Sequence, residues 1–370
     1  MKSFFRIILL VSIALGPLAL YAEYFHSQGQ IAGWLEHNDL AQNKLNIGFR
    51  YLPEFSVSRE IEKDKTLDAD IAINAYAQAP ADFLYKAKDN SDLKFYRFWG
   101  RFHSNQFETR LGLQQISFGP AKILRSLMWF DSIDPRDPLK FTEGNWAALA
   151  RYYFLNNSNI WLWGLYGNDK LKGLETVKTD PNKIEYGGRC QFPLPKGEGG
   201  ISFDRRCVNQ NDWNRIMAVP LADCVENRLG FDGYWDIGVG LWFETSIGKM
   251  DLASDQQEYE ENYTIGADYT FSSGLHILGE HMFTGKGADF NCLGKKNNVS
   301  VFVADYKLGI LDAVSAIEYY NWDIGKVYSN LRWLRTYDNW QFNLIVYSNG
   351  DDTTTSYSGR GMQFLVMYNY

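Results

Sequence analysis

Short segments in which apolar and polar side chains alternate recur along almost the whole chain, and they constrain the fold more than any other feature. In segment 263–271 one set of positions carries Tyr263, Ile265, Ala267, Tyr269 and Phe271, and the other carries Thr264, Gly266, Asp268 and Thr270. Successive side chains of a strand point to opposite faces, so each segment predicts a strand with one apolar face. Segments 228–237 and 363–370 repeat the pattern. In lipid only helices and closed barrels satisfy the backbone, and the chain beyond its first residues has no apolar run of about 20 residues. We therefore expect an all-β fold, a single transmembrane antiparallel up-and-down β-barrel.

The N-terminus has the composition of an export signal. Lys2 and Arg6 precede the apolar run 7–15, and small residues follow it. We expect a signal peptide over residues 1–22, cleaved after Ala22, and a barrel over 23–370 in the outer membrane of a Gram-negative-type cell. Loss of the two basic residues would take the formal charge from −7 to −9. A net acidic chain is a poor ligand for nucleic acid, so no nucleic-acid partner is expected.

Short and long connections alternate between the expected strands. The short ones are 103–106, 155–159, 195–199, the junction near Gly238, 272–274, 308–310 and 335–338. The long ones are 79–92, 118–145, 168–183, 208–227, 249–261, 284–297 and 349–361. Outer-membrane barrels have short periplasmic turns and longer outer loops, and the count predicts about 18 strands, or 16 if the first pair is misassigned. Segment 53–66 breaks the scheme, because it should be a periplasmic turn yet is long and charged.

The last residue is aromatic. Tyr370 ends an alternating strand, which is similar to the signal that outer-membrane barrels present to the barrel assembly machinery. An edge strand of a soluble sandwich is the alternative interpretation. The expected partners are therefore outer-membrane lipid, the assembly machinery through Tyr370, and a small solute. A homo-oligomer is left open, because lipid-facing and subunit-facing apolar surfaces look alike in a sequence.

Strand parity directs two groups of charged residues toward the interior. The expected basic wall consists of Arg97, Arg101, Arg110 and Arg151 on three consecutive strands. The expected acidic wall consists of Asp232, Asp236, Glu244, Asp268 and Glu280. Opposed charges across a pore orient and select solutes. The alternative is that these are ordinary interior charges that pair with one another.

The long connection 118–145 is unusually apolar for a solvated loop. It carries Leu124, Leu127, Met128, Trp129, Phe130, Ile133 and Leu139. Such a patch has to be buried, and the interior of the barrel is the expected place, where the loop would narrow the pore. Its charged residues Asp131, Asp134, Arg136 and Asp137 would then lie beside the basic wall. A lid over the rim or a subunit contact is the alternative.

The sequence around this connection resembles a known group of barrels. Its elements are the strand from Arg110 to Gly119 with Gln114, the Asp134-Pro-Arg-Asp-Pro138 segment, and the Ala147-Ala-Leu-Ala-Arg151-Tyr-Tyr strand. This arrangement resembles outer-membrane barrels of the alginate-export and related porin-like group. The resemblance implies a porin-like barrel with an inward loop, and it implies no substrate.

The four cysteines allow three pairings. A turn near Glu198-Gly199 would place Cys190 opposite Cys207, so the first expectation is Cys190–Cys207 with Cys224–Cys292. The second is Cys207–Cys224 with Cys190–Cys292. Export makes disulfides permissible. Their spacing fits no zinc pattern, so we expect neither a metal nor another cofactor.

Catalytic motifs are absent from the sequence. It has five histidines and neither a Gly-x-Ser-x-Gly nor a His-Glu-x-x-His motif, so no catalytic residues are expected. The expected function is a porin-like channel for small polar or charged solutes. The alternative is a barrel with a closed pore that acts in binding, adhesion or assembly through its outer loops, and a barrel enzyme is the third and weakest interpretation.

Overall fold

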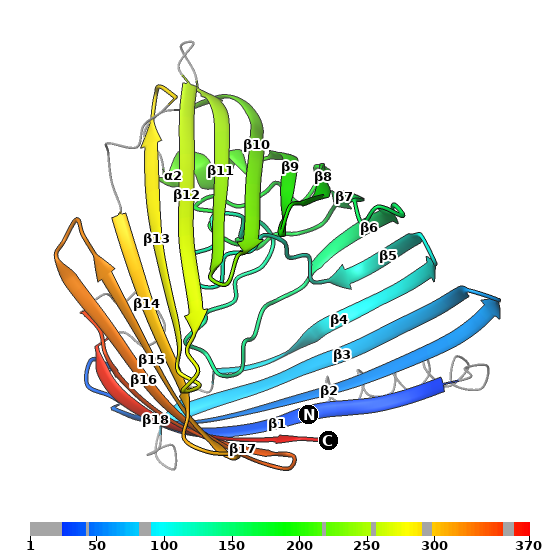
Figure 1. Ribbon diagram of the computed structural model, residues 1–370. Helices are drawn as coiled ribbons and strands as arrows, with labels where there is room; N and C mark the ends of the chain where they lie inside the picture. Colours follow the sequence, from blue (N-terminus) through cyan, green and yellow to red (C-terminus); the bar gives the residue numbers. More distant parts are fainter. Residues whose placement is uncertain are drawn as a thin grey trace.

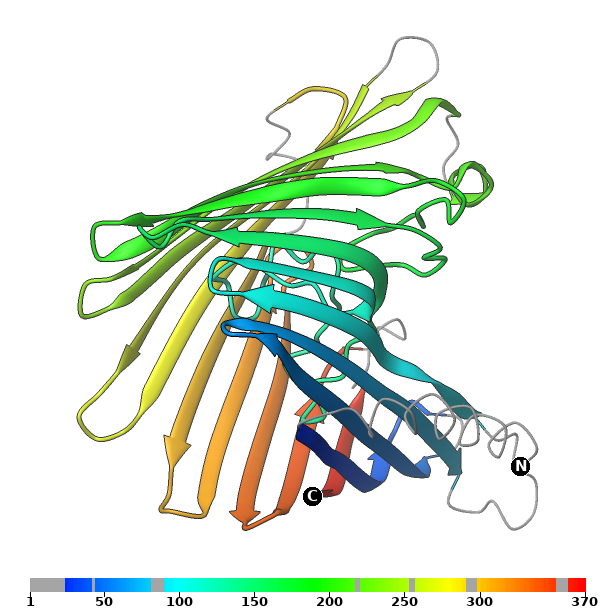
Figure 2. The ribbon, with the colours of Figure 1, turned by 90° about the vertical axis from the view of Figure 1, so that its right-hand side faces the viewer.

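The computed structural model describes residues 24–41, 44–80, 90–216, 220–252, 257–290, 298–350 and 359–370. Within them, eighteen antiparallel strands form one sheet that curls into a cylinder (Figures 1 and 2). Strand β1 pairs with both β2 and β18, which closes the sheet on itself. The expected barrel and the count of 18 are confirmed. The expected signal peptide, residues 1–22, lies outside the described residues.

The elements follow one another in chain order, and each strand pairs with its neighbours in the sequence. They are β1 (Tyr24–Asn38), β2 (Leu45–Glu62), β3 (Lys65–Pro80), β4 (Asn90–Ser104), β5 (Phe107–Gln114), β6 (Asn145–Tyr153), β7 (Asn159–Leu165), β8 (Glu185–Leu194), β9 (Gly197–Cys207), α2 (Gln210–Ile216), β10 (Leu221–Asp236), β11 (Gly240–Leu252), β12 (Gln257–Thr270), β13 (His276–Gly287), β14 (Asn298–Lys307), β15 (Asp312–Asn321), β16 (Lys326–Tyr337), β17 (Trp340–Ser348) and β18 (Arg360–Asn369). Among the described residues, no helix is both long and apolar enough to cross a bilayer.

Segment 53–66 does not form the long turn that the sequence suggested. Strand β2 extends to Glu62 and β3 begins at Lys65, so a tight turn joins the two strands. Asp64 has a φ of 66° in this turn, a conformation that Asp and Asn adopt more readily than most residues. The charges of this segment therefore belong to two long strands, and the alternation of short and long connections includes this link as well.

The two faces of the wall differ as the alternation predicts. Leu111 is 60% exposed and Ile265 is 56% exposed on the outer surface. Their strand neighbours Arg110 and Thr264 have their side chains in the interior, where each contacts other polar groups. A barrel in lipid needs this arrangement, because it turns apolar groups toward hydrocarbon and polar groups toward the lumen.

The seam of the barrel depends on close contact between the two ends of the chain. The backbone groups of Gly29 and Tyr370 exchange two hydrogen bonds of 3.1 Å. The Tyr370 hydroxyl lies 3.0 Å from the hydroxyl of Tyr51. A Cβ on residue 29 would lie 2.6 Å from the Tyr370 hydroxyl oxygen and 2.7 Å from the Leu52 carbonyl oxygen. Glycine at this position therefore lets the last residue join the closed sheet.

Replacing Gly29 by alanine is expected to weaken the seam. The added methyl group would overlap both a side chain and a backbone oxygen, and overpacking of this kind typically costs about 1–3 kcal/mol. We expect the G29A variant to unfold at a lower temperature in detergent than the wild type. The matched control is G33A on the same strand, where the nearest atom to a new Cβ is 3.9 Å away. Equal unfolding temperatures for the two variants would contradict this account of the seam.

Candidate functional site

The segment between β5 and β6, residues 115–144 and here named the inward loop, crosses the interior of the barrel (Figure 1). Its Phe118, Leu127, Trp129 and Phe130 pack with side chains of β6 and β7 in one cluster. Its Ala121 and Leu124 pack with β11, β13, β14 and β15 in another. Leu139 contacts a third cluster on β1 and β18. Contacts with three distant parts of one closed wall are possible only from inside, which confirms the expected inward fold of this loop.

Two glutamates of the wall hold the first part of the inward loop. Glu244 of β11 accepts hydrogen bonds from the backbone N–H groups of Ala121 at 2.8 Å and Leu127 at 2.9 Å. Glu280 of β13 accepts those of residues 122–124 at 2.6 to 3.0 Å. Irregular backbone inside a barrel lacks the partners that a strand has, and ionised carboxylates are strong acceptors for its N–H groups. These two side chains therefore take the place of a pairing strand.

Gly119 allows this close approach. Its φ is 95°, which is strained for residues with a side chain, and a Cβ there would meet the carboxylate of Glu244. Thr264 of β12 adds a further anchor, because its hydroxyl donates to the carbonyl of Leu124 at 2.6 Å. The loop is thus fixed to three adjacent strands through its backbone, independently of its own side chains.

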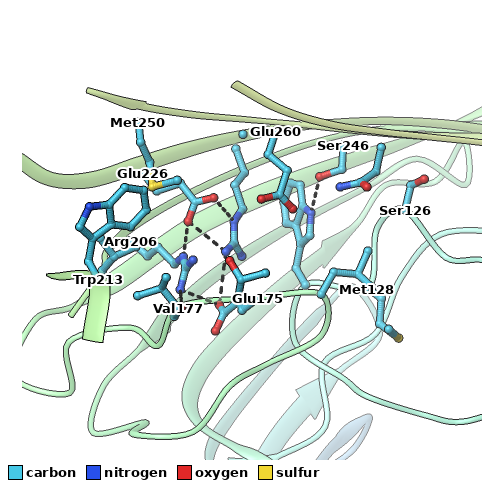
Figure 3. Close-up of a pocket in the computed structure, with 17 residues that line it drawn as sticks. Ser126, Met128, Glu175, Val177, Arg206, Trp213, Glu226, Ser246, Met250 and Glu260 are labelled. Carbon is cyan, nitrogen blue, oxygen red and sulfur yellow. Dashed lines mark hydrogen bonds and ion pairs between the residues drawn. The ribbon is translucent and has the colours of Figure 1, made fainter. Parts of the chain in front are cut away.

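A second connection, residues 166–184, also enters the interior and is fixed by a buried ion network (Figure 3). Glu175 lies at its centre, 3.1 Å from Lys172, 3.1 Å from Arg206 and 3.4 Å from Arg228. Lys172 also pairs with Glu185 at 2.8 Å, and Glu226 pairs with both arginines. Each buried charge here has an opposite charge within contact, as burial requires. The backbone N–H of Leu174 bonds the Met128 carbonyl at 3.2 Å, so the two connections support each other.

Each of the four arginines of the expected basic wall has a partner. Arg101 pairs with Asp68 at 2.8 Å, and Arg110 and Arg151 both approach Glu108, at 3.1 and 3.8 Å. Arg97 donates to Gln115 at 3.0 Å and to the carbonyl of Thr142 at 3.3 Å, so it also anchors the inward loop. The sequence interpretation missed both acids, although Glu108 shares a face with Arg110. Asp68 lies on β3, directly opposite Arg101 in the β3–β4 ladder, and this cross-strand pairing depends on the strand register.

The five residues of the expected acidic wall have different roles. Glu244 and Glu280 bind the inward loop, and Asp232 forms a two-pronged ion pair with Arg189 at 2.5 and 2.8 Å. Asp236 accepts the backbone N–H of Gly238 at 3.1 Å in the adjoining turn, and Asp268 lies 3.4 Å from His276. Each of these five acids therefore has a hydrogen-bond or ion-pair partner within the protein, and Asp232 is the one that pairs with an arginine.

The charged residues of the inward loop mostly bond within the loop. Arg136 pairs with Asp134 at 2.8 Å, and Asp131 pairs with Arg125 at 2.5 Å. Asp137 accepts the Leu139 backbone N–H at 3.0 Å. Burial raises the pKa of the Asp137 carboxyl, and this hydrogen bond and the nearby Arg50 charge act in the opposite direction.

An open cavity of about 520 Å³ remains between the inward loop and one side of the wall. The wall contributes Trp34, Glu36, Arg50, Tyr76, Gln78, Gln363 and Leu365, and the loop contributes Ser132, Asp134, Asp137, Leu139, Phe141 and Glu143. Arg50 of β2 is the main residue that the sequence interpretation missed. The alternation of exposed Ile47 and Phe49 with Gly48 and Arg50 would have placed it inside. Among the described residues, no group of three or more His, Cys, Asp or Glu side chains could hold a metal ion.

The cysteine pairing differs from the first expectation. Cys207 is bonded to Cys224, with Cα atoms 4.7 Å apart, and Cys190 is a free, exposed thiol. The turn between β8 and β9 lies at residues 195–196, not near Gly199, so Cys190 faces Ile201 and the pairing Cys190–Cys207 is wrong. The Cys207–Cys224 bond of the second expectation is present. Cys292 lies outside the described residues.

A closed up-and-down barrel with a loop folded inside it is the architecture of porin-like outer-membrane proteins. No family model and no curated protein matches the chain. Solved structures share the fold. OmpF of Salmonella typhi, in complex with daunomycin, has a TM-score of 0.56 at 11% identity and covers 94% of this chain and 97% of its own.

Two further structures give the same result. OmpT, an outer-membrane protein of Vibrio cholerae in its trimer form, has a TM-score of 0.53 at 10% identity, over 94% of this chain and 99% of its own. The anion-selective porin from Comamonas acidovorans has a TM-score of 0.52 at 10% identity, over the same shares. This chain therefore has the fold of a bacterial porin-like outer-membrane barrel.

Replacing Glu280 by glutamine is expected to loosen the inward loop. The amide keeps one acceptor oxygen but presents an N–H₂ group to backbone donors, and a hydrogen bond to a charged group contributes about 1.5–3 kcal/mol. We expect the amides of residues 122–124 to exchange with solvent deuterium about tenfold faster or more in E280Q. The control is E198Q on β9, whose carboxylate bonds Gln191 at an exposed position. Unchanged exchange in E280Q would show that the carboxylate does not hold the loop.

Proposed function

We propose that this protein is an outer-membrane channel that passes small polar or charged solutes between the inward loop and the wall of β1–β3 and β18. The observation that carries the proposal is the uneven filling of the barrel. The loop packs tightly against β6, β7, β11 and β13–β15, while an open cavity of about 520 Å³ lies on the opposite side. A barrel of this size without an inward loop would enclose a wide aqueous pore, so the loop determines the width of the passage.

The charges around the cavity support selection among polar solutes. Arg50 lies on the wall and Asp134 and Asp137 lie on the loop, so solutes in the gap meet both signs of charge. The four arginines on β4–β6 and the acids on β10–β13 are proposed to contribute to ion preference as solutes approach this gap. Because these charges have partners close by, we expect each of them to contribute less to the electrostatic field in the gap than Arg50 does.

The location and partners follow from the same proposal. The apolar outer surface is proposed to contact outer-membrane lipid, and Tyr370 to engage the assembly machinery before it joins the seam. Export through a cleaved signal peptide over residues 1–22 belongs to this proposal. A homo-oligomer is also part of it, since OmpT of similar fold has a trimer form.

A second candidate function is a barrel with a closed pore that binds a partner through its outer loops. The packing of two connections inside the barrel, residues 115–144 and 166–184, favours it, because both occupy space that a wide pore would leave open. Conductance distinguishes the two candidates, since a closed barrel gives none.

The channel is tested by recording single-channel currents from the purified protein in planar bilayers. Wild type is expected to give discrete conductance steps. The S132C variant, labelled with a bulky cationic methanethiosulfonate reagent, is expected to conduct less, because Ser132 lines the cavity.

Two controls accompany this measurement. Wild type treated with the same reagent accounts for the exposed Cys190 thiol. Labelled S273C carries the same group in the exposed turn between β12 and β13 and is expected to conduct normally. A wild type without conductance steps would overturn the channel, and normal conductance of labelled S132C would remove the cavity from the solute path.

A further inference from the structure

An arginine with two guanidinium nitrogens that lack a hydrogen-bond partner in the described part of the chain faces the open cavity. Arg50 is only 8% exposed, and it lines the cavity from β2. Its Nε and Nη1 atoms are buried and have no hydrogen-bond partner among the described residues. A guanidinium is always charged and carries five N–H donors, and leaving such donors unpaired away from water is costly. A solute that supplied acceptors at this point would remove that cost.

Aromatic rings hold the guanidinium without using its donors. The guanidinium carbon lies 4.3 Å from the ring centroid of Phe141 on the loop and 5.4 Å from that of Tyr76 on β3. Ala32, which faces Arg50 across the β1–β2 ladder, has no polar side-chain atom to offer. The guanidinium is thus positioned by cation–π contacts, while its Nε and Nη1 atoms have no hydrogen-bond partner among the residues that the structure describes. A planar carboxylate, which can accept two parallel hydrogen bonds, suits such a fork best.

A negative charge faces the same space from the other side. Asp137 of the inward loop lines the cavity and, among the described residues, takes part in no ion pair. Asp134 beside it is matched by Arg136, and Glu36 accepts a hydrogen bond from Tyr347 at 2.9 Å. A simple anion would be attracted by Arg50 and repelled by Asp137. A solute with one charge of each sign would be attracted by both.

We propose that the cavity binds a small zwitterionic amino acid with an apolar side chain. Its carboxylate accepts hydrogen bonds from Arg50, and its ammonium group faces Asp137. Its side chain lies on the apolar surface of Trp34, Tyr76 and Leu139, which line the same cavity. The inference rests on the proposed channel function, because it names the solute class of that passage.

Isothermal titration calorimetry on the purified protein in detergent tests the site without requiring conductance. The probes are L-phenylalanine, N-acetyl-L-phenylalanine, which lacks the ammonium charge, and phenethylamine, which lacks the carboxylate. We expect L-phenylalanine to bind about tenfold more tightly than either analogue, since each loses one charge-assisted contact.

Two variants test the carboxylate-binding and the ammonium-binding parts of the site separately. R50Q is expected to weaken L-phenylalanine binding about tenfold and to abolish its advantage over phenethylamine. D137N is expected to abolish its advantage over N-acetyl-L-phenylalanine, because only the ammonium group responds to that charge. The control is R332Q on β16, an arginine whose strand neighbour Leu331 is exposed on the outer surface. It is expected to bind all three probes as the wild type does.

The outcomes distinguish this inference from the channel. The proposed site is wrong if L-phenylalanine binds no more tightly than phenethylamine. It is also wrong if R50Q and R332Q bind L-phenylalanine with the same affinity. In either case, conductance measured in buffer alone still tests the channel. If the protein binds L-phenylalanine with the expected preferences but gives no conductance, the site stands and the channel fails. Should R50Q not fold, D137N decides alone, because it changes a loop residue outside the strands.

Discussion

Every other feature of this molecule depends on the closure of its backbone hydrogen-bond ladder. A strand in hydrocarbon cannot leave its N–H and C=O groups without partners, so the sheet has to join its own ends. Here nine residue pairs between β1 and β18 complete the cylinder, and Gly29 and Tyr370 bring the last residue into it. The closed sheet encloses an interior, and loops and side chains have to fill part of that space.

The segments that fill the interior also need hydrogen-bond partners for their backbone groups. The inward loop has no strand beside it, and Glu244 and Glu280 supply the acceptors that a ladder would otherwise give. Charges that the sequence suggested as a wall facing solutes thus hold the loop in place. The connection 166–184 is held by ion pairs instead. Its Glu175 pairs with Arg206 of β9, Arg228 of β10 and Lys172 of its own segment. In both cases, buried charges are stable because each has partners close by.

The result is an interior with two unlike sides. One side is packed with aromatic and aliphatic side chains, and the other retains a cavity in which Arg50 and Asp137 face open space. Under the proposed channel function, this asymmetry would confine a solute to one part of the cross-section. Arg50 and Asp137 both line this cavity, so the proposed passage would present one charge of each sign to a solute.

The sequence by itself determined the barrel, its strand number and the burial of the loop. These follow from local patterns, since alternation fixes which side chains share a face and an apolar loop has to avoid water. Only the tertiary structure decided which interior charges remain free. Parity places Arg101, Glu244 and Arg50 inside alike. The partners of Arg101 and Glu244 come from a strand and a loop distant in sequence, whereas the Nε and Nη1 atoms of Arg50 have no hydrogen-bond partner among the described residues. A turn misplaced by a few residues was enough to pair Cys190 with the wrong partner, because cross-strand neighbours depend on register, and alternation repeats every two residues without specifying it.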